Sequence, residues 1–251
     1  MRDPNQYALF SDERQRPFFA LLDRVPDLPY KEVVDLGCGG GELTVSIANK
    51  FPKAHVVGLD NSPQMLAGAS KHARPGLEFE LGDIAKYDRP ADLIFTNAAL
   101  QWLTDHGTLF PQLAKLVNPG GVFAVQMPAN FTQPSHTLLE ETARTGPWAS
   151  KLTSWRLQFV NPLEYYVEML MGMGFAVDAW ETRYFFVLQG EDPVMQWIKG
   201  TSLQPILNLL DAQEQQDFCT AYATALREFY PPTDNGTVFP FKRIFWVARR
   251  D

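Results

Sequence analysis

The chain has 251 residues, of which 45% are hydrophobic and only 20% charged, so it can build a large core and is neither disordered nor a coiled coil. Its net charge of −7 argues against a nucleic-acid partner, because nucleic-acid binding requires a basic surface. No apolar run approaches the roughly 18 residues of a membrane helix, and the first residues lack a signal peptide's apolar stretch, so we expect no membrane partner and a cytoplasmic location.

Short apolar runs alternate with helical periods in the first half of the chain. The runs expected to form strands are Val33–Leu36, His55–Asp60, Leu77–Leu81, Asp92–Asn97 and Val122–Met127. Between them, Leu43, Ile47 and Phe51 recur at the spacing of one helix face, and Ser62 can cap a second helix that Pro63 opens. Repeated alternation of this kind predicts a parallel sheet covered by helices on both faces.

The pattern changes after Met127. Residues 129–161 show only weak helical periodicity, and a helix is expected from Pro162 to Met173, where Gly174 ends it. The other elements expected are a strand at Val177–Leu188, two or three helices over 192–230 with breaks near Gly200 and Pro205, and a final strand at Phe241–Ala248.

Together these elements predict an α/β fold. We expect a Rossmann-like, seven-stranded, mostly parallel sheet with helices on both faces and a helical cap formed by insertions. The whole chain, residues 1–251, is expected to form a single domain. Its core is expected at about 30–128, 162–190 and 240–251, and its cap insertions at about 129–161 and 191–239.

A glycine-rich loop, Gly37–Gly41, follows the first expected strand and opens the first helix. Glycines are needed there because the backbone must turn tightly and approach a ligand without intervening side chains. Dinucleotide-binding folds have a small residue at the position where this chain has Glu42. A carboxylate at that helix start would also repel a pyrophosphate. The loop, preceded by Asp35, therefore favours a ligand that carries no phosphate.

Acidic residues end the next two expected strands. Asp60 ends the second strand, where its carboxylate can accept hydrogen bonds from both hydroxyls of a ribose. Asp83 follows the third strand, where it can accept from an adenine amino group while Ile84 packs against the ring. Ligands bind at the carboxyl edge of such a sheet, so these acids together with Asp35 predict an adenosine site there.

As a set, these motifs resemble those of class I S-adenosylmethionine-dependent methyltransferases over about residues 33–127. The segments that carry the resemblance are Val33–Thr44, Val57–Asp60, Gly82–Ile84, Asp92–Asn97 and Asn118–Gly121. It implies S-adenosylmethionine as the cofactor, with Gln101 and Trp102 beside the sulfonium. The cofactor-binding residues expected are Asp35, Gly37, Cys38, Gly39, Gly41, Asp60, Asn61, Met65, Asp83, Ile84, Asn97, Gln101 and Trp102.

Further runs along nearly the whole chain are similar to the trans-aconitate 2-methyltransferase family. They are Phe10–Arg14, Phe95–Trp102, Ala124–Pro128 and Phe245–Arg250. The similarity implies methylation of one carboxylate of a small polycarboxylic acid, trans-aconitate. Malonyl-carrier-protein methyltransferases share several of these motifs, so a different acceptor, that protein or another small metabolite, stays open. A nicotinamide-dependent oxidoreductase is a weaker alternative, since Glu42 counts against it.

A carboxylate is ionised at pH 7, so its methylation requires no general base and we expect no catalytic residue. Positioning and exclusion of water should supply the catalysis. Cations should hold the substrate's other carboxylates, because a cation bound to the attacking carboxylate would lower its nucleophilicity. The substrate-binding residues expected are Arg14, Arg16, His136, Arg156, Tyr166, Tyr184 and Arg243. The spacing of cysteine and histidine residues predicts no metal site. The oligomeric state is left open. His106 is expected on the surface, at the start of a helix.

Overall fold

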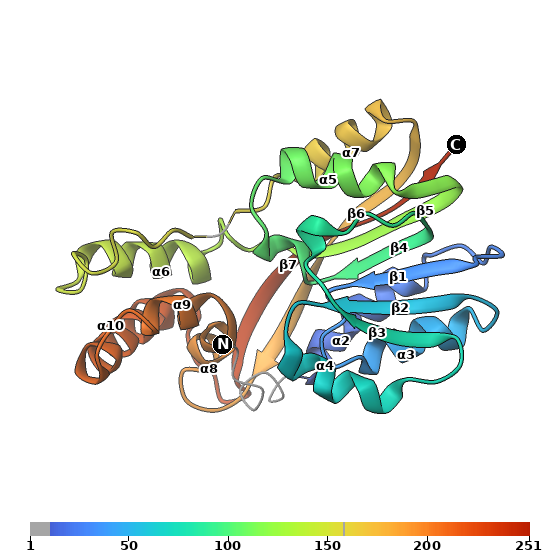
Figure 1. The fold of residues 1–251 in the computed structure, drawn as a ribbon. Helices are drawn as coiled ribbons and strands as arrows, with labels where there is room; N and C mark the ends of the chain where they lie inside the picture. The colour runs from blue at the N-terminus through green and yellow to red at the C-terminus, as the bar shows by residue number, and fades with distance from the viewer. Residues whose placement is uncertain (1–10, 158) are drawn as a thin grey trace. The chain divides into compact units, whose positions relative to one another are not determined.

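The computed structural model describes residues 11–157 and 159–251, with side chains from Gln15 onwards (Figure 1). Strands and helices alternate in its first half, as expected. The elements there are α2 (Ser11–Leu22), β1 (Glu32–Leu36), α3 (Glu42–Lys50), β2 (His55–Asp60), α4 (Pro63–Ala69), η1 (Ser70–His72), β3 (Leu77–Leu81), η2 (Ile84–Lys86), β4 (Ala91–Asn97), η3 (Leu100–Trp102), α5 (His106–Lys115) and β5 (Val117–Pro128).

The second half contains two long strands separated by helices. Its elements are α6 (Pro134–Thr145), α7 (Leu163–Gly172), β6 (Phe175–Leu188), α8 (Pro193–Ile198), η4 (Lys199–Leu203), α9 (Gln204–Leu207), α10 (Ala212–Phe229) and β7 (Thr237–Arg250). Gly174 has a φ of 83°, a left-handed conformation that suits glycine, just after α7. The expected helix, its end and both late strands are therefore present.

The seven strands form one sheet in the order β3-β2-β1-β4-β5-β7-β6. Strands β1 to β5 pair in parallel, whereas β7 runs antiparallel to β5. This confirms the predicted α/β class with a mostly parallel, seven-stranded sheet. Because β1 to β5 are parallel, their carboxyl ends lie along one edge of the sheet, which brings together the loops that follow them.

Helices cover both faces of this sheet (Figure 1). On one face, Phe18 of α2 packs against Phe95 of β4, with ring centroids 5.2 Å apart. On the other, Phe110 of α5 packs against Phe123 of β5, with centroids 6.2 Å apart. Phe123 pairs with Ile94, the neighbour of Phe95. Since successive residues of a strand point to opposite faces, these two contacts lie on opposite sides of the sheet.

Two segments differ from the elements expected. The segment Asn118–Gly121, whose sequence is typical of a turn, lies within β5, which begins at Val117 and shifts register against β4 between Ala91 and Leu93. The break expected near Gly200 is a π-helical turn, η4, that joins α8 to α9. Pro205 interrupts nothing because it lies in the first turn of α9, where no backbone N–H is needed.

The chain divides into two compact units. The sheet unit comprises Gln15–Pro128, Asn161–Thr182 and Arg243–Asp251, and the helical unit is described over Ala129–Val160 and Arg183–Lys242. In the helical unit, α6 packs on α10: the hydroxyl of Tyr222 donates to the carbonyl of Ser135, whose N–H donates to the hydroxyl of Tyr230 at 3.1 Å. Strands β6 and β7 run through both units.

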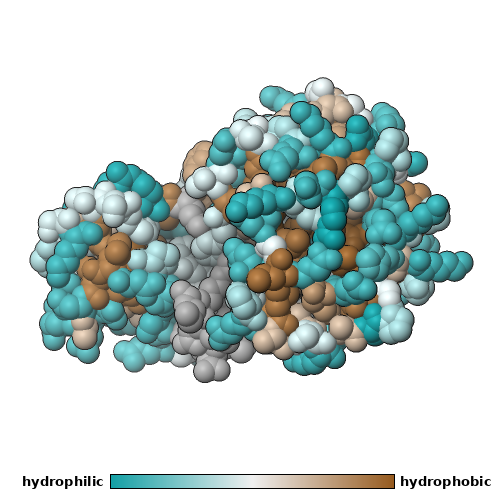
Figure 2. All heavy atoms as spheres, in the orientation of Figure 1, coloured by the Kyte–Doolittle hydropathy of each residue, from teal (hydrophilic) through white to brown (hydrophobic). Residues whose placement is uncertain are grey.

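Hydrophilic side chains cover most of the surface in Figure 2, with smaller apolar areas between them. Many large aromatic side chains are buried instead, and Trp246, Phe110 and Phe123 are completely enclosed. Among the helices of the described ranges, none combines the length and the apolar character of a membrane span.

Candidate functional site

The glycine loop after β1 uses three left-handed residues. Gly37, Gly39 and Gly41 have φ values of 83°, 58° and 80°. A Cβ on Gly37 would lie 2.3 Å from the Cβ of Ala99, and one on Gly41 would lie 2.7 Å from the ring of Phe79. A Cβ on Gly39 would meet no atom within 4 Å. Packing therefore requires glycine at the first and last positions, whereas Gly39 borders open space.

Asp60 ties this loop to the start of α4. Its Oδ2 accepts from the N–H of Gly39 at 3.0 Å and its Oδ1 from the N–H of Ser62 at 2.9 Å. The Ser62 hydroxyl accepts from the N–H of Met65, which confirms the expected cap. A carboxylate has about four lone-pair sites, so Asp60 can accept further hydrogen bonds. Met65 is half-buried and Asn61 exposed beside it.

Asp35, at the end of β1, is enclosed and faces α3. The hydroxyl of Thr44 donates to its Oδ2 at 2.6 Å. Burial raises the pKa of Asp35 to about 7; the hydrogen bond from Thr44 opposes this rise and the charge of Asp60 adds to it. Asp35 thus holds the strand end to the helix behind the loop.

The last residue of β4 and the segment after it present two buried oxygen atoms that could accept hydrogen bonds. The amide of Gln101 donates to the carbonyl of Ala98 at 2.7 Å, which leaves its Oε1 as an acceptor. Among the described residues, neither this Oε1 nor the Oδ1 of Asn97 has a hydrogen-bond partner. Because Ala99 abuts Gly37, both acceptors belong to the segment that packs on the glycine loop.

The remaining expected cofactor residues lie at the same edge. Cys38 is half-buried, and its N–H donates to a backbone carbonyl of β2 at 3.1 Å. Asp83 follows β3 and caps η2 by accepting from a backbone N–H at 3.0 Å, and Ile84 beside it is half-buried. Trp102 ends η3 and is also half-buried. The thirteen expected residues therefore gather along the carboxyl ends of β1 to β4 and in the loops that follow.

Of the expected substrate residues, three are described in the sheet unit. Arg16 is exposed on α2, and Arg243 is buried on β7, where its Nη1 donates to the Oε1 of Gln126 at 3.3 Å. Tyr166 lies on α7 and is completely buried. The side chain of Arg14 lies outside the described residues.

The other three belong to the helical unit. His136 is buried between the hydroxyls of Ser135 and Ser202, and burial lowers its pKa to about 4, so it is neutral at pH 7. Arg156 is exposed and donates to two backbone carbonyls of its own turn. Tyr184 is buried in β6. Among these three, Arg156 supplies the positive charge.

Tyr166 and His106 form a buried pair in the sheet unit. The tyrosine hydroxyl lies 2.6 Å from Nδ1 of His106 and accepts from the N–H of Asn161 at 3.1 Å. Nε2 of His106 donates to the carbonyl of Leu100 at 3.1 Å, and burial lowers the pKa of the imidazole. His106 does begin α5, but the expected surface position is wrong because both ring nitrogens are bonded inside. This geometry favours a core role for Tyr166.

Replacing Tyr166 with Phe is expected to lower the free energy of unfolding by about 1–3 kcal/mol. The change leaves Nδ1 of His106 and the N–H of Asn161 without their hydrogen-bond partner, in a region where His106 is buried. Urea denaturation measures the loss, with Tyr165→Phe on the exposed side of the same helix as the matched control, expected within about 0.5 kcal/mol of the unsubstituted protein. Equal losses in the two variants would contradict the buried pair.

The methyltransferase domain family model matches residues 29–166. The chain is 45% identical to a trans-aconitate 2-methyltransferase of Streptomyces avermitilis over 99% of this chain and 97% of that protein. It is 44% identical to one of Methylobacterium nodulans over 99% and 98%. The chain belongs to the methyltransferase family.

A solved structure supports the fold of this methyltransferase. The YcgJ protein of Bacillus subtilis superposes with a TM-score of 0.63 at 14% identity, over 94% of this chain and 98% of its own. The family resemblance predicted from the sequence motifs is thereby confirmed at two levels, by the family model and by relatives over nearly the whole chain. The fold likeness confirms the α/β class independently of sequence.

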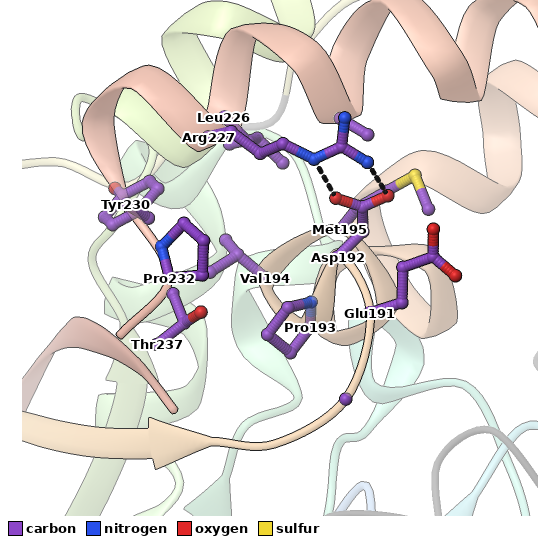
Figure 3. Close-up of a pocket in the computed structure, with 12 residues that line it drawn as sticks. Glu191, Asp192, Pro193, Val194, Met195, Leu226, Arg227, Tyr230, Pro232 and Thr237 are labelled. Atoms are coloured by element: carbon purple, nitrogen blue, oxygen red, sulfur yellow. Dashed lines mark hydrogen bonds and ion pairs between the residues drawn. The ribbon is translucent and has the colours of Figure 1, made fainter. Parts of the chain in front are cut away.

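The methyltransferase also has a cavity of about 240 Å³ within its helical unit (Figure 3). It lies between the starts of α8 and β7 and the end of α10, and Val194 and Leu226 are among its lining residues. At its rim, Arg227 binds Asp192 through two hydrogen bonds of 2.7 Å. The arginine side chain is half exposed, so water screens this ion pair and it contributes little to stability. Of the expected cofactor and substrate residues whose side chains the structure describes, none lines the cavity.

Two polar residues of the sheet unit were not among those expected. Thr44 orients Asp35, and Gln126 bonds Arg243. Gln126 could have been found from the sequence, because it is a polar residue within the otherwise apolar run Val122–Met127. A polar side chain there must find partners when the strand is buried.

Proposed function

We propose that this methyltransferase transfers the methyl group of S-adenosylmethionine to a carboxylate oxygen of trans-aconitate. The observation that carries the proposal is the similarity, over 99% of the chain, to relatives that bear this activity in their name. The proposal includes a cytoplasmic location and no nucleic-acid partner, as expected from composition and charge.

The residues at the edge of the sheet fit the cofactor. Gly39 borders open space where the backbone can approach a ligand, and Asp60 beside it can still accept hydrogen bonds from ribose hydroxyls. The unpartnered oxygens of Asn97 and Gln101 would accept from the amino group of the methionine part, which is a cation. Asp83 would accept from the adenine amino group.

The cofactor supplies an electrophilic methyl group on a sulfonium. With the cofactor bound, a carboxylate oxygen would accept this methyl group and the sulfur would keep the electrons of the carbon–sulfur bond, so the products would be the methyl ester and S-adenosylhomocysteine. No proton moves, because a carboxylate is already ionised at pH 7. The chain's residues therefore act by binding and orienting the reactants and by excluding water from them. In well-oriented reactions, positioning of this kind lowers the activation free energy by roughly 7–11 kcal/mol.

Arginines are the best candidates for holding the substrate's other carboxylates. Arg16 and Arg156 are exposed, and Arg243 is buried in the middle of β7. His136 is neutral at pH 7, and the hydroxyl of Tyr166 carries no charge and is already bonded to His106 and to the N–H of Asn161. We therefore assign substrate charge recognition to arginine rather than to these two residues.

Methyl transfer to trans-aconitate is measured with a labelled methyl donor and mass spectrometry of the ester. We expect a monomethyl ester together with S-adenosylhomocysteine. Label on a malonyl carrier protein or another metabolite, with trans-aconitate unlabelled, would overturn the acceptor assignment. Absence of heat on titration with either S-adenosyl ligand would overturn the cofactor assignment.

Replacing Gly39 with Ala is expected to weaken S-adenosylhomocysteine binding by about tenfold or more, because the added Cβ enters the space proposed for the cofactor. Gly120→Ala is the matched control: Gly120 also has a positive φ, 76°, and a Cβ there also meets nothing within 4 Å. Both variants should lose about 1–2 kcal/mol of stability from backbone strain. Calorimetry measures the affinity of each variant for S-adenosylhomocysteine, which only Gly39→Ala should weaken. Equal affinities in the two variants would contradict a ligand at Gly39.

A further inference from the structure

A buried polar pair lies beyond the expected cofactor residues at the same edge of the sheet. Gln126 near the end of β5 is completely buried, and Arg243 of β7 is 5% exposed. The guanidinium Nη1 donates to the Oε1 of Gln126 at 3.3 Å. A positive charge and an amide have thus been placed together in the interior of the sheet unit.

The hydrogen bond fixes which way the amide of Gln126 points. Because Oε1 accepts from Arg243, the Nε2 group of Gln126 is left as the donor. This Nε2 is buried and has no hydrogen-bond partner among the described residues. Buried donors are nearly always paired, so this N–H group is available to an acceptor that a bound ligand brings.

The strand register places this pair beside the proposed methyl-transfer site. Gln126 pairs with Asn97 on one side and with Phe245 on the other, and Arg243 precedes Phe245 by two residues. Residues that pair, and residues two apart in a strand, share a face of the sheet. With strands about 4.8 Å apart, Gln126 and Arg243 lie roughly 5 and 10 Å beyond Asn97 across one face.

We infer that Gln126 and Arg243 bind a carboxylate of the acceptor that is not methylated, and so select acids with more than one carboxylate. This inference rests on the proposed function. An arginine fork and an adjacent amide N–H are donors that match the planar oxygens of a carboxylate. The grip falls on a non-reacting carboxylate, because a cation on the attacking oxygen would withdraw its electrons. The reacting carboxylate is thereby held at a set distance, nearer Asn97 and the glycine loop.

Gln126→Glu tests the inference with little change of shape. The new carboxylate would pair with Arg243 and repel the substrate, so we expect trans-aconitate to bind on the order of 100-fold more weakly. Calorimetric titration of trans-aconitate into the protein loaded with S-adenosylhomocysteine measures this without turnover. Affinity for S-adenosylhomocysteine itself should stay within about twofold, because neither residue is assigned to the cofactor.

Arg243→Met should raise KM for trans-aconitate by a similar factor, and Arg249→Met, exposed on the same strand, is its matched control. An unsaturated monocarboxylic acid should bind weakly to the unsubstituted protein, and Gln126→Glu should change that affinity little. A folded Gln126→Glu variant with unchanged affinity for trans-aconitate would overturn the inference. So would the absence of trans-aconitate binding in the unsubstituted protein. If trans-aconitate bound and its binding required both Gln126 and Arg243, but no methyl ester formed, the inference would stand and the proposed function would be wrong.

Discussion

S-adenosylhomocysteine is expected to bind the Asp60→Ala variant on the order of 1,000-fold more weakly than the unsubstituted protein. The carboxylate accepts from the N–H groups of Gly39 and Ser62, so its removal releases the glycine loop from the start of α4. The same change removes the acceptor that we propose for the ribose hydroxyls. Both losses act on the bound state, and isothermal calorimetry measures their sum.

Asp92→Ala is the control for the structural part of this effect. The Oδ2 of Asp92 also accepts from two backbone N–H groups, those of Lys31 and Glu32, at 2.7 and 3.0 Å. Asp92 lies near the start of β4, at the opposite edge of the sheet from the proposed site. Its replacement should lower stability and leave affinity within about twofold. If both variants lost affinity equally, general destabilisation would explain the loss and the ribose assignment would fail.

The parallel core of the sheet could be predicted because each strand is a continuous apolar run bounded by turn residues. Strand β2 was predicted with the bounds His55–Asp60 that the structure has. The irregular start of β5 could not be predicted, because the sequence Asn118–Gly121 is typical of a turn. The strand instead begins before this segment, and it pairs with β4 at Val117 and again from Val122 after a register shift. Likewise Gly200 predicts a break, whereas its neighbours on both sides continue as helix through a π-helical turn.

Positions along the sheet edge could also be predicted, but side-chain directions could not. The acids at the strand ends were expected to face a ligand together, yet Asp35 faces α3 and bonds Thr44, while Asp60 bonds the loop. A strand-end pattern gives the edge on which a residue lies, and the surrounding packing decides where its side chain turns. Buried partners such as Gln126 emerge only when two strands distant in sequence are placed side by side.

Asp35→Asn is expected to gain stability relative to the unsubstituted protein as the pH rises from 5 to 8, by about 3 kcal/mol. The carboxyl is 4% exposed, and burial raises its pKa from 3.8 to about 7 in spite of the hydrogen bond from Thr44. Ionising Asp35 is therefore costly in the folded chain and easy in the unfolded chain. The amide of Asn cannot ionise, so the variant does not bear this cost.

Stability falls as the pH rises because the folded chain binds a proton at Asp35 that the unfolded chain has lost. Between its ordinary pKa of 3.8 and about 7, Asp35 holds its proton in the folded chain and has lost it in the unfolded chain. The contribution of this group to stability is therefore largest at low pH and declines as the pH rises to about 7. About two of the three pKa units fall above pH 5, and each unit corresponds to about 1.4 kcal/mol.

Urea denaturation at pH 5, 6, 7 and 8 measures the difference between the two proteins, in which the titration of all other groups largely cancels. Asp92→Asn is the matched control. Partial burial opposes ionisation of Asp92, but hydrogen bonds from Asn118 and from the backbone hold its pKa below the ordinary value. Its titration thus lies below the measured range, and its replacement should cost a constant amount from pH 5 to 8. A pH-independent difference for Asp35→Asn as well would mean that the Asp35 carboxylate is stabilised in place, and the burial argument would be wrong.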